Sequence, residues 1–226
     1  MERIRPGEKV KLPFAIGTVS ESVLSNNSDQ SYVKLTADFS AQSSQKSNLP
    51  KEVTTDITRQ IAAVPNPELA VDTLYSDGPI SGSGPLPPVA GEETTYVLHF
   101  TVGSVLSGLE SAQMKAKLPG NVKIAGEEKL SSGTFSTDAV SGTITWSIPT
   151  VPPTGENSPT QMYLPVTVTP GSNQVGDVVQ LLRDIRFSGT DVSADVVVRD
   201  GDIQAPTTVP DDIGSNSRSG QVQEGL

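Results

Sequence analysis

The chain of 226 residues contains no cysteine, which excludes disulfide frameworks, thiolate metal sites and cysteine nucleophiles. It has one histidine, His99, so no zinc site with two histidines can form within one chain. Long apolar runs are also missing: no window approaches the roughly 18 apolar residues of a membrane helix. The first residues, Met1–Glu8, lack the apolar segment of a signal peptide. We expect the chain as written to be soluble, with no signal peptide and no anchor.

Positive charge is scarce. Sixteen Lys and Arg stand against 26 Asp and Glu, a formal net charge of -10. Such a chain repels phosphate backbones and anionic lipid headgroups, so we expect neither nucleic acid nor membrane insertion. Aromatic residues make up only 4%, whereas there are 20 glycines and 18 prolines. This balance favours short strands joined by turns over a helical enzyme.

Apolar residues alternate along most of the chain, which predicts β-strands. The clearest series is at residues 94–102, where one face carries Tyr96, Leu98, Phe100 and Val102. About seven such strands within residues 92–205, separated by Gly and Pro, predict an antiparallel β-sandwich of immunoglobulin type. The fold class is therefore all-β, with a jelly roll or a barrel as the alternative.

Residues 1–64 are predicted to form a partial second sandwich of three strands. These strands are expected at Val10–Ile16, Val33–Phe39 and Val53–Ile61. Within this region, Leu12–Ile16, Val33–Ser40 and Thr55–Arg59 match, weakly but in order, the later segments 164–168, 180–188 and 194–199, as an internal repeat would. Three strands seldom close a sandwich, because their apolar face lacks an opposing sheet. Either the frame begins inside a longer surface protein, or these strands pack on the second domain or on another chain.

Composition sets the other boundaries. Residues 65–91 are rich in Pro and Gly and are predicted to be a linker, with an edge strand at Leu69–Tyr75. Residues 206–226 are predicted to be a disordered polar tail.

Four segments between Thr94 and Thr169 carry a family resemblance. They read TTYVLHFTV, AKLPGNV, GTITWSIPTVPP and YLPVTVT. In this order they resemble the immunoglobulin-like repeat domain of uncharacterised function in large bacterial cell-surface proteins, in the C-terminal region of such a protein. The resemblance implies an extracellular or cell-surface location and a spacer or adhesion role. It implies neighbouring domains of the same protein, or another cell-surface protein, as partners, and supplies no catalytic residues.

Few side chains are candidates for chemistry. Asp195, Asp200 and Asp202, with Asp191 nearby, are candidate calcium ligands, with a solvated acidic turn as the alternative reading. No other cofactor or metal is expected. No nucleophile elbow or nucleotide-binding fingerprint occurs, so no catalytic residue is assigned.

Aromatic side chains and lysines are further candidates for a functional role. Trp146 has the inward parity of a core residue, while Tyr32, His99 and Tyr163 have outward parities, and the two tyrosines are candidates for ligand contact. Lys115 or Lys117 joined to a late-strand aspartate would form an isopeptide cross-link, but nothing in the spacing supports one.

We therefore predict a non-enzymatic structural or spacer module of a bacterial cell-surface protein. The alternative is an adhesin that recognises glycan or protein through the end loops 103–112, 125–141 and 170–177, with or without calcium. A third possibility, an accessory domain of a hydrolase, requires a neighbouring catalytic domain.

Overall fold

The computed structural model describes residues 32–42, 52–62, 67–103, 105, 107–153, 159–209 and 220–225. The first two of these segments, β1 (Tyr32–Gln42) and β2 (Glu52–Ala62), form an antiparallel hairpin. They correspond to two of the three strands predicted within residues 1–64. The third, at Val10–Ile16, lies outside the described residues.

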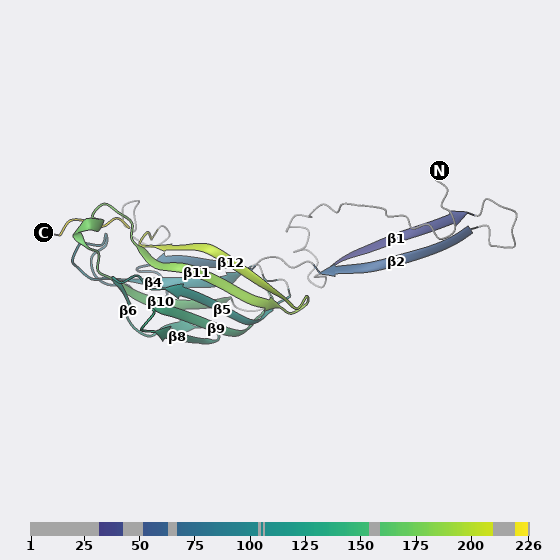
Figure 1. Cartoon of the computed structure of the whole chain (residues 1–226). Coiled ribbons are helices and arrows are strands. Elements are labelled where there is room, and N and C mark those ends of the chain that lie inside the picture. The colour runs from purple at the N-terminus through teal and green to yellow at the C-terminus, as the bar shows by residue number, and fades with distance from the viewer. Residues whose placement is uncertain are drawn as a thin grey trace. The chain divides into compact units, whose positions relative to one another are not determined.

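The described part of residues 67–225 forms a sandwich of two antiparallel sheets, as predicted (Figure 1). The first sheet has the order β3-β4-β10-β6, and β7 also pairs with β10. The second has the order β12-β11-β5-β9-β8. A short 3-10 turn, η1 (Ser172–Gln174), follows β10. The strands are β3 (Glu68–Leu74), β4 (Thr94–Gly103), β5 (Leu109–Lys117), β6 (Val122–Ile124), β7 (Lys129–Leu130), β8 (Thr134–Asp138), β9 (Thr143–Val151), β10 (Thr160–Val168), β11 (Gln180–Asp191) and β12 (Val196–Pro206).

The core lies between the two sheets and confirms the predicted alternation. The series Tyr96, Leu98, Phe100 and Val102 of β4 is buried. It faces the second sheet, where Trp146 is fully buried and its Nε1–H donates to the Ser132 carbonyl at 2.9 Å. Trp146 is therefore a core residue, because its one polar atom is satisfied inside the protein.

The Pro/Gly-rich stretch predicted as a linker belongs to the sandwich in its described part, residues 67–91. Its expected edge strand is β3, which pairs with β4. The glycines that follow β3 let two backbone segments lie in close contact; they do not make this segment flexible. A Cβ on Gly82 would lie 2.4 Å from the Thr95 carbonyl oxygen, and one on Gly84 would lie 2.2 Å from that of Glu93. Only glycine fits there, since real Cβ atoms do not come so close.

The tail predicted to be disordered also contributes to the core in its described parts, 206–209 and 220–225. Thr207, Val209 and Val222 are buried. The Thr207 hydroxyl donates to the Gly220 carbonyl at 2.6 Å, and Val222 N–H donates to the Asp177 carbonyl at 3.0 Å. The prediction from polar composition was wrong for these parts, because a few buried residues are enough to hold a short segment against the sandwich.

The predicted internal repeat does not extend to strand register. Phe39 of β1 lies opposite Thr55, whereas Phe187 of β11 lies opposite Asp200. The repeat matched segment 55–59 with segment 194–199, and Asp200 lies outside the latter. The two hairpins therefore share an antiparallel form but not the expected pairing.

The described sandwich begins at one end, called here the proximal end, and its last segment, 220–225, lies at the opposite, distal end. At the proximal end, β3 begins with Glu68 opposite Gly103. At the distal end, beyond the start of β4, Ala90 N–H donates to the Gln223 carbonyl at 2.9 Å. The ten residues of β4 lie between the two ends, about 30 Å at the rise of a strand. The chain therefore crosses the sandwich lengthwise, along the strand direction (Figure 1).

Removing the Tyr96 hydroxyl should stabilise the protein. Burial, followed by the neighbouring Tyr75, raises the pKa of Tyr96, and within the described residues the hydroxyl has no hydrogen-bond partner. An unsatisfied buried polar group is costly, so Tyr96→Phe is expected to raise the free energy of unfolding by about 1 kcal/mol in urea titrations. Tyr75→Phe is the control, because the Tyr75 hydroxyl donates to the Gly84 carbonyl and its loss should destabilise. A less stable Tyr96→Phe variant would contradict this account.

Candidate functional site

The outer face of the first sheet carries the histidine and tyrosine singled out in the sequence. Asp72, His99, Tyr163 and Lys129 lie opposite one another across β3, β4, β10 and β7. The His99 and Tyr163 rings stack with centroids 4.3 Å apart and planes inclined by 5°. Both side chains are half-buried on the outer face, which confirms their predicted outward parity.

Polar contacts engage this row within the protein. His99 Nε2 lies 3.1 Å from Gln161 Oε1 and 3.3 Å from the Thr101 hydroxyl. No hydrogen bond or ion pair links Asp72 to His99 in the described part of the chain, so no acid orients the ring. Gln161 and Thr101 both lie at Nε2, and among the described residues no carboxylate is hydrogen-bonded to the ring to activate a His99–Thr101 pair.

The loop after β3 covers the same face. A Cβ on Gly78 would lie 3.5 Å from the Tyr163 ring, and Lys129 Nζ donates to the Pro79 carbonyl at 2.8 Å. Val97 is fully buried although its parity places it outward. Lys129 thus holds the loop, and the loop lies beside the Tyr163 ring. The ligand contact predicted for Tyr163 stays a prediction. The side chain of Tyr32, the other candidate, lies outside the described part.

The three calcium candidates do not converge in what the structure describes. Asp200 Oδ2 accepts a hydrogen bond from Leu69 N–H at 2.9 Å, and Oδ1 accepts one from Gly201 N–H at 2.7 Å. Asp195 is exposed in the turn before β12, and the side chain of Asp202 is outside the description. Among the described residues, no three His, Cys, Asp or Glu side chains are grouped to hold a metal ion. The calcium site stays a prediction.

Asp191 has a structural role that sequence reasoning did not identify. Its side chain is 3% exposed and accepts hydrogen bonds from the Ser107 hydroxyl at 2.6 Å, the Ser193 hydroxyl at 2.8 Å and Ala194 N–H at 2.9 Å. Burial raises the pKa of Asp191, but these bonds and one from Ser193 N–H outweigh it and lower the pKa overall. The Asp-x-Ser pattern after a strand is the local signal of such a turn.

The lysines considered for an isopeptide bond are on the surface. Lys115 and Lys117 are both exposed on β5. Lys117 Nζ lies 3.7 Å from Asp184 Oδ2, and the two side chains are 59% and 60% exposed. A nucleophilic lysine requires a desolvated amine, so this contact is a surface ion pair.

The end loops of the adhesin alternative do not gather at one end. Segment 103–112 leads into β5 at the proximal end, while 170–177 lies at the distal end, and 125–141 contains β7 and β8. A shallow distal depression of about 640 Å³ includes part of one loop only. It is lined by Ala90, Gly91, Pro170, Gly171, Ser172, Val175, Glu224 and Gly225.

Comparison with known proteins gives no family. No protein family and no curated protein matches the sequence. Similar solved structures include a 35 kDa C-terminal fragment of the major pilin GBS80 of Streptococcus agalactiae, at 12% identity and a TM-score of 0.39, covering 63% of this chain and 56% of that one. The major pilin subunit BcpA of Bacillus cereus matches at 8% identity and 0.39, covering 75% and 47%.

An enzyme is also among the similar structures. It is the GH20 exo-β-N-acetylglucosaminidase of Vibrio harveyi, at 11% identity and a TM-score of 0.33, with 70% of this chain and 18% of the enzyme covered. The chain thus spans about half of each pilin and under a fifth of the enzyme. At these TM-scores the likenesses assign no function. In addition, no helix within the described residues has the length and hydropathy needed to span a membrane.

Replacing Asp191 should change stability in a pH-dependent way. Since its pKa is lowered in the folded protein, its carboxylate stabilises the fold above the unfolded pKa of about 4, and this contribution is lost as the pH falls through the folded pKa. Asp191→Asn is expected to cost about 2 kcal/mol at neutral pH and to flatten the acid limb of the stability curve. Urea unfolding from neutral to acidic pH measures both effects.

The matched control is Asp195→Asn in the same turn. Asp195 is exposed and has a φ of +53°, a conformation that asparagine tolerates, so this variant should change stability by less than about 0.5 kcal/mol. Equal losses for both variants would show that the turn, and not the buried carboxylate, sets the effect.

Proposed function

We propose that this chain is a non-enzymatic structural module that spaces parts of a bacterial cell-surface protein. The observation that carries the proposal is the lengthwise passage of the chain, from Glu68 at the proximal end to the segment 220–225 at the distal end. A module held at opposite ends adds its full length to an array and transmits tension along its strands.

The first strand suits such a load. All seven residues of β3 pair with β4, from Glu68 opposite Gly103 to Leu74 opposite Val97. Tension applied at the start of β3 acts parallel to the strand, so the ladder hydrogen bonds across it are loaded together. A strand pulled from the sheet edge would instead lose them one after another.

Two side-chain hydrogen bonds tie this edge strand to the other sheet. Asp200 of β12 accepts from Leu69 N–H, and the Thr73 hydroxyl donates to the Pro206 carbonyl at 2.7 Å. β3 and β12 are the edges of their two sheets. The ties therefore close one side of the sandwich, where no backbone ladder joins the sheets.

The distal end is fastened by the last described residues. Gln223 bridges Val89, and Gln221 bridges Val178. The buried hydroxyl of Thr207 joins this segment to the end of β12 by donating to Gly220. Tension at the C-terminal side thus reaches both the start of β4 and the start of β11.

The cell-surface location rests on the resemblance of residues 94–169 to surface repeat domains. The acidic balance of the chain suits a soluble array.

Single-molecule pulling tests the proposal. Because the chain has no cysteine, Glu68→Cys and Glu224→Cys, both at exposed positions, supply handles at the two ends of the sandwich within the full chain. A spacer should resist until the sandwich of residues 67–225 opens in one cooperative event. Early release of β3 or of segment 220–225 at low force, followed by separate opening of the rest, would overturn the proposal.

The ties between the sheets should contribute to this resistance. The double variant Asp200→Ala/Thr73→Val removes both hydrogen bonds and is expected to lower the unfolding force and to cost about 2 kcal/mol in stability. Glu110→Ala, an exposed change on β5, is the control and should leave both unchanged. If the double variant behaves like the control, the edge of the sandwich is held by other contacts.

A further inference from the structure

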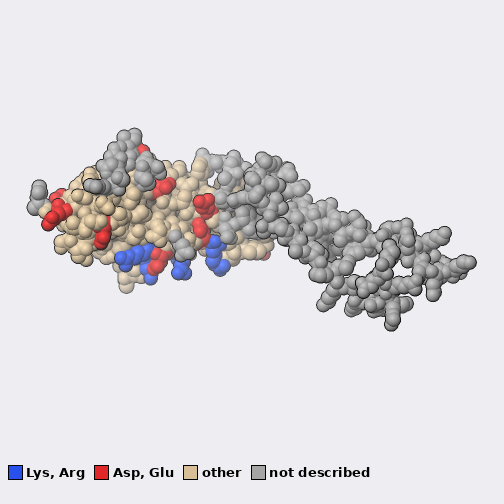
Figure 2. Space-filling model, turned by 90° about the horizontal axis from the view of Figure 1, so that it is seen from above, with Lys and Arg blue, Asp and Glu red and all other residues tan. Residues whose placement is uncertain are grey.

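The positive charges of the sandwich are concentrated on one face. The described part of residues 67–225 contains seven Lys and Arg: Lys115, Lys117, Lys123, Lys129, Arg183, Arg186 and Arg199. Five of them lie on β5, β11 and β12 of the second sheet and are exposed. Figure 2 shows the blue side chains gathered along one long side of the molecule. We call the set Lys115, Lys117, Arg183, Arg186 and Arg199 the cationic face.

Four of these residues are in register. Lys115 of β5 lies opposite Arg186 of β11, and Lys117 lies opposite Arg183. Neighbouring strands are about 4.8 Å apart, and residues two apart on a strand are separated by about 6.8 Å. The four cations thus form a compact rectangle. Like charges directly opposite each other destabilise a sheet, so this arrangement costs the folded protein stability.

A strained bulge is needed to build the rectangle. The register shifts between Arg183 and Arg186, and Asp184 between them has a φ of +53°. Ile185 and Leu182 on either side of the Arg183–Asp184 pair are buried, while both members of the pair are exposed. Without the extra residue, strict alternation would turn Arg183 toward the core. β-Bulges re-aim side chains in this way, and backbone strain is retained where it serves a purpose.

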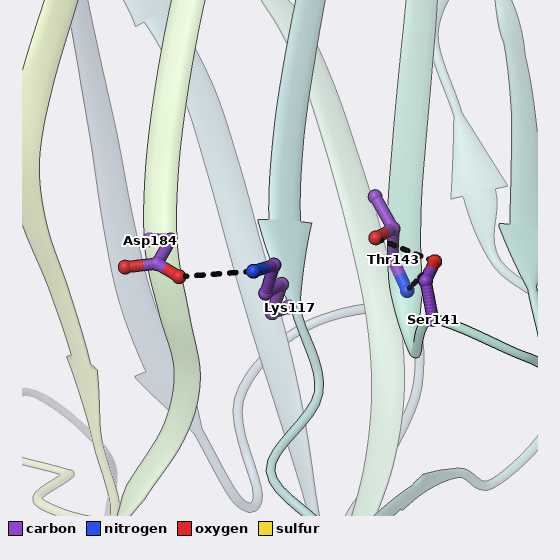
Figure 3. A network of polar contacts seen from close by, with 4 residues as sticks. All are labelled: Lys117, Ser141, Thr143 and Asp184. Carbon is purple, nitrogen blue, oxygen red and sulfur yellow. Dashed lines mark hydrogen bonds and ion pairs between the residues drawn. The ribbon is translucent and has the colours of Figure 1, made fainter.

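Acidic residues compensate only part of this charge. The Lys117–Asp184 ion pair is exposed and therefore weak (Figure 3). Asp138, the last residue of β8, lies in the same row as Lys117 across β9 and accepts from Val140 N–H and the Ser141 hydroxyl. Glu110 lies further along β5, and Asp202 lies in the irregular part of β12 near Arg186 in the register. The described acids of this face, Glu110, Asp138 and Asp184, are fewer than its five cations, so its described residues keep a net positive charge.

The rest of this face carries hydroxyl and amide groups. In the rows beside the cations lie Gln113, Thr143, Thr145, Ser147 and Ser188. Val197 of β12 shares the outward parity of Arg199, and the other exposed large apolar side chains of the described sandwich lie at turns, strand ends and the distal segment: Val140, Val175, Val178, Val192 and Val196. The described part of the face therefore carries one valine and no aromatic anchor of the kind found at protein interfaces, and no aromatic ring on which a nucleic-acid base could stack.

We propose that the cationic face binds an acidic polysaccharide, with the Lys and Arg side chains pairing to its carboxylate or sulfate groups and the hydroxyl and amide side chains bonding to its sugar hydroxyls. Charge complementarity carries the assignment, since an anionic chain relieves the repulsion within the rectangle. A linear polymer fits a flat sheet face that is not a pocket. The site adds a binding activity to the spacer role and does not depend on it.

The test uses the full chain with dextran sulfate and polygalacturonate as acidic probes and with neutral dextran as the reference. Binding is measured by titration at low salt. The double variant Lys115→Gln/Arg186→Gln removes one cross-strand pair, and Lys123→Gln/Lys129→Gln removes the same charge from the first sheet. The first variant should weaken binding about tenfold, and the second less than about twofold; salt near 300 mM should weaken wild-type binding strongly.

Thermal unfolding of the free proteins provides a second measurement. Relief of like-charge repulsion should leave Lys115→Gln/Arg186→Gln at least as stable as the wild type, so weaker binding would not reflect unfolding. Equal losses for the two double variants would overturn the proposal, because net charge alone would then explain binding. Equal binding of neutral dextran, tighter binding of a single-stranded DNA, or no binding of either acidic probe would overturn it as well.

Discussion

Everything else in this structure depends on the contact between the inner faces of two sheets. A chain with 4% aromatic residues must build that contact mainly from aliphatic side chains. The few large rings are therefore placed where both sheets meet, and Trp146, Tyr96 and Phe100 are fully buried there. Close packing leaves little room for error in this layer, because each methylene lost or added is felt by its neighbours. The Trp146 Nε1–H donates a hydrogen bond inside this layer, whereas the Tyr96 hydroxyl has no hydrogen-bond partner among the described residues.

Once the faces are covered, the edges become the exposed weakness of each sheet. The sandwich handles its two long edges by joining β3 to β12 through Asp200 and Thr73. On the other side, the outermost strands are short: β7 has two residues and β8 has five. Short edges offer little template for another strand to pair with. Pairing with another chain is therefore opposed by the two side-chain hydrogen bonds on one side of the sandwich and by the short edge strands on the other.

The sequence predicts the interior of the sandwich well and its margins poorly. Alternation reports which side chains face inward, so β4, β9, β10 and the burial of Trp146 followed directly from it. A glycine can make a segment flexible or can let two backbone segments pack closely, and composition does not distinguish the two. Gly82 and Gly84 pack closely against the backbone, so a packed segment was predicted as a linker. The described parts of the tail were also predicted wrongly, because isolated valines such as Val209 and Val222 in a polar sequence give no periodic signal.

The cationic face could not be read from the sequence because its members come from three strands between residues 115 and 199 and are never adjacent as a run. The bulge at Asp184 also breaks the alternation that would have predicted the side of Arg183. The net charge of -10 did not predict this face either, because a net charge says nothing about where the charges lie on the surface.

The two outer faces of the sandwich differ in how far the protein itself covers them. The loop that follows β3 lies over the outer face of the first sheet, where Lys129 donates to the Pro79 carbonyl. No loop in the described part of the chain covers Lys115 and Arg186 of the second sheet, and both are exposed. The chain meanwhile occupies the two ends of the sandwich. Tension along the strands and binding on the second sheet therefore use different surfaces, and one module can serve both without either disturbing the shared core.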